Sequence, residues 1–223
     1  MKQVVTVKRR ALAANEERAE RLRGRFAASS TLVINLISSP GSGKTSLLEA
    51  TVQALDGELR CAVIEGDVAT ENDANRIRAL GVPAHQILTS GACHLDARLV
   101  ESGLAESGIP EVDILFIENV GNLICPTTYD LGEDFKVVVL SVAEGDDKPV
   151  KYPAIFSRAE VAVISKLDLL PYVPFDLEAV KEQIASLNPT GEILALSSLK
   201  GDGVDDWIGL LQARLEDKRR VQV

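Results

Sequence analysis

A glycine-rich turn between an apolar run and a helical pattern constrains this chain more than any other feature. Residues 32–37 form the apolar run, residues 46–50 have helical spacing, and the turn reads Ser38-Ser39-Pro40-Gly41-Ser42-Gly43-Lys44-Thr45. A strand, a turn of this composition and a helix, in that order, are typical of a phosphate-binding P-loop. We therefore expect the chain to fold around a nucleotide site.

The turn supplies both backbone and side-chain ligands for phosphate. Its glycines let successive N–H groups point at phosphate oxygens, and the start of the helix adds further donors. Lys44 can reach the β- and γ-phosphates, and the Thr45 hydroxyl can ligate Mg²⁺. Ser38 stands where the usual pattern has its first glycine, and Gly41 would supply the missing flexibility. The expected nucleotide-binding residues of the turn are Gly41, Ser42, Gly43, Lys44, Thr45 and Ser46.

Composition excludes several classes of function. The net charge of −9 argues against nucleic acid or an anionic membrane as the main partner, although residues 1–25 carry eight Lys/Arg against three Glu. No apolar run is long enough to span a membrane, and the N-terminus lacks the apolar core of a signal peptide. Three cysteines cannot all pair, which suits free or metal-bound thiols in a reducing cytosol. We expect a cytoplasmic protein.

Strands and helices alternate along the sequence. This alternation predicts an α/β fold with a mostly parallel sheet and helices on both faces. The continuous apolar runs at 113–117 and 136–142 indicate strands that are buried on both faces. The predicted strands are residues 32–37, 61–64, 84–88, 113–117, 136–142, 161–164 and 193–196. The predicted helices after the P-loop are residues 74–80, 95–105, 177–187 and 204–215.

The first residues of the chain are predicted to form a helical appendage. We divide the chain into this appendage, residues 1–29, and a P-loop domain, residues 30–223. Within the helix predicted at 8–27, one stripe is apolar, so it should pack on the core or on a partner, with its basic face in solvent. The residues of that stripe are Leu12, Ala19, Leu22 and Phe26.

Acidic residues follow two of the predicted strands. In such sheets, ligands bind beyond the carboxyl ends of the strands. Asp67 closes the second strand and Glu118 the fourth, where a nucleotide hydrolase would hold Mg²⁺ and the attacking water. Gly121 would let the backbone approach the γ-phosphate. With Lys44, these two carboxylates form the predicted catalytic set; the alternative for each is a solvated loop residue.

The sixth strand is followed by a candidate for base recognition. The carboxylate of Asp168 can accept hydrogen bonds from guanine N1–H and the 2-amino group, which adenine does not offer as a pair, and the stem of Lys166 can lie along the base. GTPases usually have Asn-Lys-x-Asp here, and Ser165 replaces the Asn. We therefore expect the loss of an amide that ties this loop to the P-loop. Ser197 and Ser198, after the last strand, are expected to support the base.

Two cysteines and a histidine form a candidate metal site. Cys93 and His94 are expected to start a helix, and Cys125 follows the fourth strand. Thiolates and imidazole suit Zn²⁺ or Ni²⁺. Near a helix N-terminus, Cys93 should have a depressed pKa. The alternative is packed residues without a metal, because the spacing is no zinc-finger signature. Cys61 lies within a strand and is interpreted as a small core residue.

With these residues assembled, the chain resembles the HypB family, P-loop GTPases of the SIMIBI type that assist nickel insertion into [NiFe]-hydrogenase. The resemblance covers about residues 30–215. Its motifs are Ser-Ser-Pro-Gly-Ser-Gly-Lys-Thr at 38–45, Glu-Gly-Asp at 65–67, Asp-Ala at 73–74, Cys-His-Leu-Asp-Ala at 93–97, Glu-Asn-Val-Gly-Asn-Leu at 118–123, Cys-Pro at 125–126 and Asp-Lys-Pro at 147–149. Some members carry a cysteine-rich or histidine-rich nickel-binding stretch that is not found here, so we expect no high-affinity nickel store.

The resemblance implies a cytosolic GTPase that dimerises when it binds GTP. It implies a Ni²⁺ or Zn²⁺ site at the dimer interface, formed by Cys93, His94 and Cys125. Partners would be a second copy of the chain, a HypA-type nickel-binding accessory protein and the hydrogenase large subunit. Lys148 is expected to reach the nucleotide or the partner subunit on closure, unless it is simply a solvated charge.

Two other functions stay open on the sequence. A urease-type nickel GTPase is similar in fold, but its Cys-Pro-His motif does not occur here. A nucleotide-gated dimerisation module would have no metal role at all. The short distance along the chain from Glu118 and Gly121 to Cys125 favours a link between nucleotide and metal. We expect the GTP and GDP states to differ in Ni²⁺ affinity by about 1–3 kcal/mol.

Overall fold

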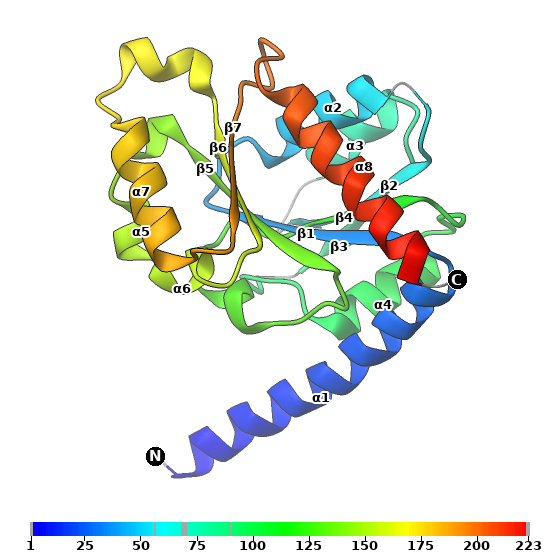
Figure 1. Cartoon of the computed structure of the whole chain (residues 1–223). Coiled ribbons are helices and arrows are strands. Elements are labelled where there is room, and N and C mark those ends of the chain that lie inside the picture. Colours follow the sequence, from blue (N-terminus) through cyan, green and yellow to red (C-terminus); the bar gives the residue numbers. More distant parts are fainter. Residues whose placement is uncertain (1, 56, 68–70, 90, 222–223) are drawn as a thin grey trace.

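A seven-stranded sheet forms the centre of the computed structural model, which describes residues 2–55, 57–67, 71–89 and 91–221. Its strands lie in the order β3-β2-β4-β1-β5-β6-β7, and each neighbouring pair is parallel. Figure 1 shows the twist of the sheet and the helices around it. The strands are β1 (Leu32–Ser38), β2 (Cys61–Asp67), β3 (Ala84–Leu88), β4 (Ile114–Glu118), β5 (Phe135–Ser141), β6 (Val161–Ser165) and β7 (Glu192–Ala195).

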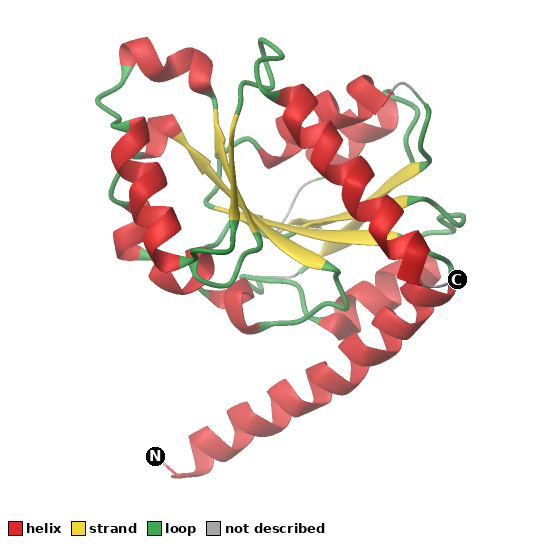
Figure 2. Cartoon of the chain, viewed as in Figure 1, coloured by secondary structure: helices red, strands yellow, loops and turns green. Residues whose placement is uncertain are grey.

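Helices cover both faces of the sheet (Figure 2), so the predicted α/β fold is confirmed. Helices α2, α3 and α8 pack on one face, and α1, α4, α6 and α7 pack on the other. The α-helices are α1 (Lys2–Ala28), α2 (Lys44–Leu55), α3 (Asn72–Ala79), α4 (Ala97–Glu106), α5 (Lys148–Lys151), α6 (Pro153–Phe156), α7 (Leu177–Leu187) and α8 (Val204–Val221). Three short 3-10 helices are η1 (Cys125–Thr128), η2 (Val142–Glu144) and η3 (Leu167–Tyr172).

The side chains of the central strands alternate between two apolar layers. In β1, Leu32 and Ile34 belong to the apolar layer under α2 and α8, and Trp207 is part of the same layer. Val33 instead belongs to the layer under α1 and α4. Every residue of β1 and β4 is buried, as predicted for strands covered on both faces. This alternation places consecutive residues at a strand end on opposite faces of the sheet.

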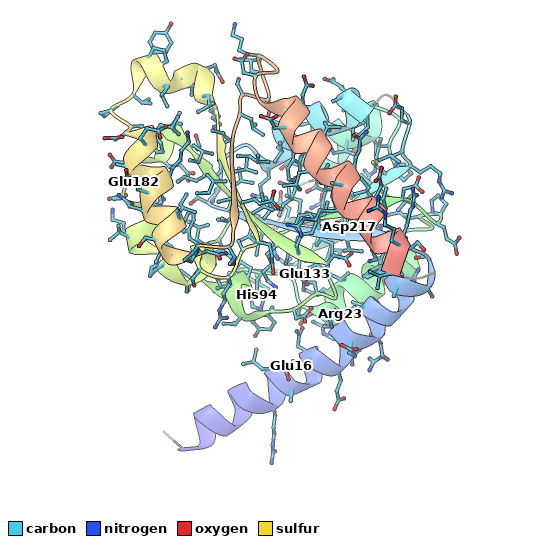
Figure 3. All side chains as sticks on the ribbon, in the orientation of Figure 1. Glu16, Arg23, His94, Glu133, Glu182 and Asp217 are labelled. Carbon is cyan, nitrogen blue, oxygen red and sulfur yellow. The ribbon has the colours of Figure 1, made fainter. Side chains whose placement is uncertain are left out.

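Helix α1 packs on the body through its second half and extends away from it at its start (Figure 1). The predicted stripe is buried at Ala19, Leu22 and Phe26, while Leu12 is half-buried. Arg23 Nη2 lies 2.6 Å from Asp130 Oδ2, and Figure 3 shows Arg23 on the side of α1 toward the body. The predicted division of the chain at residue 30 stays a prediction. Among the described residues, no helix is long and apolar enough to cross a membrane.

Candidate functional site

The P-loop connects β1 to α2 and lines a cleft of about 450 Å³. Gly41 and Gly43 have φ angles of +77° and +95°, a conformation that side chains disfavour, so glycine is needed at both turns. Lys44 Nζ donates a hydrogen bond to Ser38 Oγ at 2.8 Å. The serine that replaces the first glycine of the pattern therefore holds the lysine at the cleft.

Carboxylates line the same cleft at the ends of β2 and β4. Glu118 ends β4, is 5% exposed, and accepts a hydrogen bond from Thr45 Oγ1 at 3.1 Å. Its Oε1 is also 3.9 Å from Lys44 Nζ. Asp67 ends β2 and lines the cleft, and Glu65 lies opposite Glu118 in the β2–β4 register. The burial of Glu118 excludes the alternative of a solvated loop residue.

The buried carboxyl groups fit a hard cation. Burial, strengthened by the neighbouring Glu118, raises the pKa of Glu65 to about 10, and burial also raises the pKa of Glu118. Glu65 Oε1 and Glu118 Oε2 are buried and have no hydrogen-bond partner among the described residues. Such oxygens are costly unless a ligand satisfies them, and Mg²⁺ prefers oxygen ligands. Coordination of Mg²⁺ by Thr45, Asp67 and Glu118 remains a prediction.

The predicted base-binding residues gather beside the P-loop. Lys166 Nζ donates to the Gly41 carbonyl at 2.5 Å, and Ser197 Oγ donates to Asp168 Oδ1 at 2.5 Å. Ser198 follows Ser197 and is half-buried. The structure thus joins the loop after β6 to the loop after β7, as base recognition would require.

The amide that usually ties this edge to the P-loop is absent, as expected, but the Ser165 hydroxyl makes a tie in its place. Ser165 Oγ donates a hydrogen bond to the Ser42 carbonyl at 2.6 Å. Both residues are buried, and the end of β6 lies close enough to the P-loop for a short hydroxyl to span the gap. A serine therefore keeps the link that the sequence pattern assigned to an amide.

Lys148 and Gly121 also lie against the P-loop. Lys148 is the first residue of α5, and its Nζ is 3.4 Å from Ser39 Oγ and 3.9 Å from Glu144 Oε1. It is therefore not a freely solvated charge, although its reach to a nucleotide or a partner stays a prediction. A Cβ on Gly121 would lie 2.9 Å from the backbone nitrogen of Pro40, so only glycine permits this approach.

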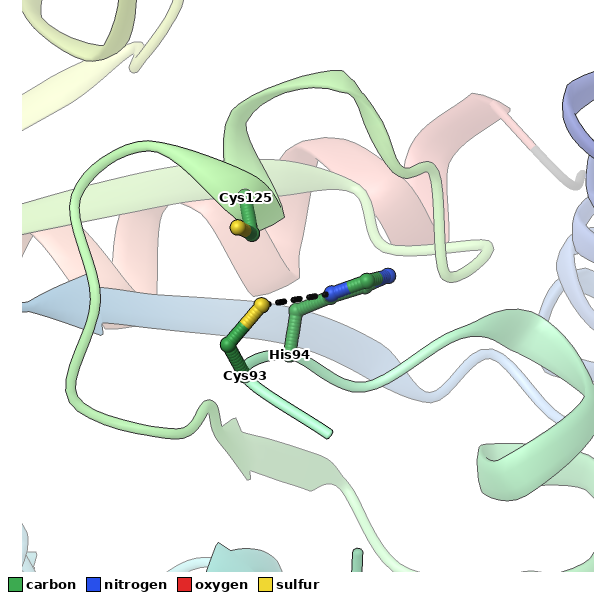
Figure 4. Close-up of side chains that lie close together, drawn as sticks. All are labelled: Cys93, His94 and Cys125. Carbon is green, nitrogen blue, oxygen red and sulfur yellow. Dashed lines mark hydrogen bonds between the residues drawn. The ribbon is translucent and has the colours of Figure 1, made fainter. Parts of the chain in front are cut away.

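Cys93 and His94, in the loop before α4, lie close to Cys125, the first residue of η1 (Figure 4). One donor atom from each lies within 4.8 Å of the others, and Cys93 Sγ is 3.6 Å from His94 Nδ1. Donors around a tetrahedral metal with bonds of about 2.3 Å to sulfur and 2.0–2.1 Å to nitrogen are about 3.5 Å apart, so this pair fits Zn²⁺ or Ni²⁺. Burial lowers the pKa of His94, which favours the neutral imidazole that binds metal.

Two predictions about Cys93 are wrong. Helix α4 begins at Ala97, and its N-cap Asp96 accepts a hydrogen bond from Leu99 N at 2.7 Å. Cys93 and His94 therefore precede the helix and do not start it. A hydrogen bond with the Cys125 thiol, together with burial, raises the pKa of Cys93, because the neighbouring sulfur opposes a second thiolate and no helix terminus compensates.

Three buried polar residues near these sites were not assigned a role from the sequence. Glu65 is two residues before Asp67, so the period of a strand could have placed both at the cleft. Asn119 Oδ1 accepts from Leu95 N at 3.0 Å, and Asn15 Oδ1 accepts from Ala97 N at 2.8 Å. No local signal reveals these two contacts, because each joins segments far apart in the chain.

Comparison with known proteins identifies the family. The CobW/HypB/UreG nucleotide-binding domain matches residues 6–195. The hydrogenase maturation factor HypB of Escherichia coli K12 is 50% identical over 200 residues, which are 90% of this chain and 69% of that protein. The chain belongs to the HypB family. The predicted resemblance is thereby confirmed.

Other HypB proteins and a more distant solved structure extend the comparison. The crystal structure of HypB from Helicobacter pylori in complex with nickel has 40% identity and a TM-score of 0.86, covering 94% of this chain and 97% of that one. The Helicobacter pylori protein is described as a hydrogenase/urease maturation factor and is 40% identical over 98% of this chain and 90% of its own length. The signal recognition particle receptor FtsY of Elizabethkingia anophelis, with 14% identity, a TM-score of 0.54 and coverage of 87% and 74%, shares the fold alone.

Proposed function

We propose that this protein is a GTP-hydrolysing nickel chaperone that assists [NiFe]-hydrogenase maturation through a GTP-dependent homodimer. Its family membership supports the maturation role. The loop after β4 supports a link between GTP hydrolysis and nickel binding. It begins at the cleft with Glu118 and reaches the metal cluster at Cys125. Because one loop serves both sites, a change at the phosphates is expected to reach the metal.

The residues of the cleft would have different roles in GTP hydrolysis. The P-loop N–H groups and Lys44 would stabilise negative charge that develops on the phosphates. Bound Mg²⁺ would neutralise charge on the β- and γ-phosphates. Thr45, Asp67 and Glu118 would hold that ion, and a carboxylate at this position can orient the attacking water. Asp168, held by Ser197, would select guanine.

The proposed partners follow from the family and from the metal cluster. Three protein donors leave a fourth position for water, a second copy of the chain or a nickel-exchanging partner. We propose a HypA-type accessory protein and the hydrogenase large subunit as partners, in the cytoplasm, where thiols stay reduced. The two alternatives are a urease client and a dimerisation module without a metal role.

Calorimetric titration of Ni²⁺ tests the proposal. We expect the protein held with GDP and the protein held with a non-hydrolysable GTP analogue to differ in Ni²⁺ affinity by about 5- to 150-fold. Cys93→Ala should weaken Ni²⁺ binding in both states. Lys44→Ala should lower the hydrolysis rate by a factor of about 100 or more. Equal Ni²⁺ affinities in the two states would leave a GTPase whose metal site is not controlled by nucleotide.

A further inference from the structure

The nucleotide cleft and the metal cluster are connected through opposite faces of the same strand ends. Glu65 and Glu118 lie opposite each other in the β2–β4 register and line the cleft. Gly66 follows Glu65, and Asn119 follows Glu118. Because successive side chains of a strand alternate, these two residues face the side of the sheet opposite to the two carboxylates. There, both meet Leu95, which follows Cys93 and His94 in the chain. One residue thus touches both strand ends.

Leu95 is fixed by packing and by a hydrogen bond. It is fully buried, and its N–H donates to Asn119 Oδ1 at 3.0 Å. A Cβ placed on Gly66 would lie 2.8 Å from Leu95 Cγ and 2.9 Å from its Cδ1. The Leu95 side chain therefore occupies the space that a larger residue at position 66 would fill.

Asn119 is fixed in turn by the strand that leads into the P-loop. It is 1% exposed, and its Nδ2 donates to Asn35 Oδ1 on β1 at 3.2 Å. Asn35 Nδ2 donates to Glu133 Oε1 at 3.1 Å, and Figure 3 labels Glu133 beneath the sheet. Asn119 Oδ1 also accepts from Val120 N at 3.0 Å. A buried amide with these partners transmits a shift of the strand end instead of absorbing it.

We propose that Asn119, together with the contact between Gly66 and Leu95, is the joint through which the nucleotide cleft positions Cys93 and His94. Cys125 is reached separately, along the loop that packs Gly121 on Pro40. Cys93 and His94 on one side, and Cys125 on the other, then both respond to a shift at the end of β4. A bound γ-phosphate therefore changes the spacing of the three metal donors. Asn119 acts as a positioning residue, and this inference rests on the proposed nickel-handling function.

The test compares Ni²⁺ affinities of the full chain at saturating GDP and at a saturating non-hydrolysable GTP analogue. For the unmodified protein the two affinities should differ by about 5- to 150-fold. In Asn119→Ala the ratio should fall toward one, because the route to Cys93 and His94 is then lost while the route to Cys125 remains. The ratio reports the link itself, whereas a merely structural defect would shift both affinities together.

A second variant and a control complete the experiment. Gly66→Ala forces Leu95 away and should change the ratio, and Leu95→Ala in the same chain should relieve the clash. If Asn119→Ala does not fold, the ratio measured for Gly66→Ala tests the joint instead. Asn188→Ala is the control, since Asn188 Nδ2 bonds the Ala159 carbonyl at 2.9 Å after α7 and should leave the ratio unchanged.

A folded Asn119→Ala that keeps the wild-type ratio would overturn the joint while leaving nucleotide control of nickel in place. Equal affinities in the unmodified protein would overturn the joint together with nucleotide control. Loss of the ratio in both Asn119→Ala and Asn188→Ala would also overturn the joint, because the effect would then not be specific to Asn119.

Discussion

At the scale of single residues, the hydroxyl of Ser165 joins the base-binding edge to the P-loop. Ser165→Ala would leave the Ser42 carbonyl without this donor, which we expect to lower the free energy of unfolding by about 1–3 kcal/mol and to weaken GTP binding. Chemical denaturation and nucleotide titration measure the two effects. Ser157→Ala is a matched control, since the Ser157 hydroxyl donates to Ala154 O at 3.1 Å on the surface.

Asp168 should decide which base is accepted. Asp168→Asn is expected to weaken GTP binding and favour xanthosine triphosphate, because the amide offers a donor to the 2-oxo group of xanthine. Competition between the two nucleotides measures the preference. If the unmodified protein binds ATP as tightly as GTP, Asp168 does not read the base.

Glu65 should make the stability of the nucleotide-free protein depend on pH. Burial raises its pKa from an ordinary value of 4.5 to about 10, so the folded state keeps a proton that the unfolded state releases. The stabilisation is therefore complete below the ordinary pKa and is lost as pH rises toward the folded one, by at most about 1.4 kcal/mol per pH unit. Glu65→Gln should flatten this dependence in denaturation measured from about pH 6 to 9 without Mg²⁺. Parallel curves for the two proteins would show that Glu65 is ionised in the fold.

At the scale of elements, helix α1 braces the metal cluster through one buried residue. Asn15 accepts from Ala97 N at 2.8 Å and donates to the Asp130 carbonyl at 2.8 Å, so it joins the start of α4 to the segment after η1. Tyr129, which precedes Asp130, has its ring centroid 4.0 Å from that of His94. The brace thus holds both sides of the metal cluster.

Replacing this residue should loosen the metal cluster. Asn15→Ala leaves a buried N–H and a carbonyl unpaired, at a cost of about 1–3 kcal/mol each, and should weaken Ni²⁺ binding with either nucleotide. Calorimetry measures the affinity, and Arg10→Ala, an exposed change on the same helix, is the control. Unchanged Ni²⁺ affinity in a destabilised Asn15→Ala protein would restrict the role of Asn15 to folding.

At the scale of the whole molecule, we predict that GTP converts monomers into dimers. Sedimentation velocity with GDP and with a non-hydrolysable GTP analogue measures the change. Lys148→Ala should lower the dimer fraction, because Lys148 lies at the P-loop with a side chain only 20% exposed. Lys151→Ala removes a charge from the same short helix, where the side chain is 61% exposed, and should have no effect. Equal losses in both variants would assign the effect to charge alone.

The sequence by itself determined the strands, the longer helices and the position of the nucleotide cleft. The P-loop, the alternating pattern of strands and helices and the position of Glu118 could be predicted because each depends on residues close together in the chain. Residues 84–88 and 177–187 form the predicted strand and helix with the predicted bounds. Periodicity specifies which side of an element is apolar, and in a parallel sheet it also specifies which end carries the ligands.

Only the tertiary structure decided how the sites are joined. The donors of the metal cluster come from the loop before α4 and from the start of η1, and the start of α4 depends on the cap formed by Asp96. The Ser165 link to the P-loop and the Asn119 contact with Leu95 join residues separated by 123 and 24 positions. Local sequence propensity does not predict such partners. The distance between the two residues of each pair is set by the packing of strands and helices that are far apart in the chain.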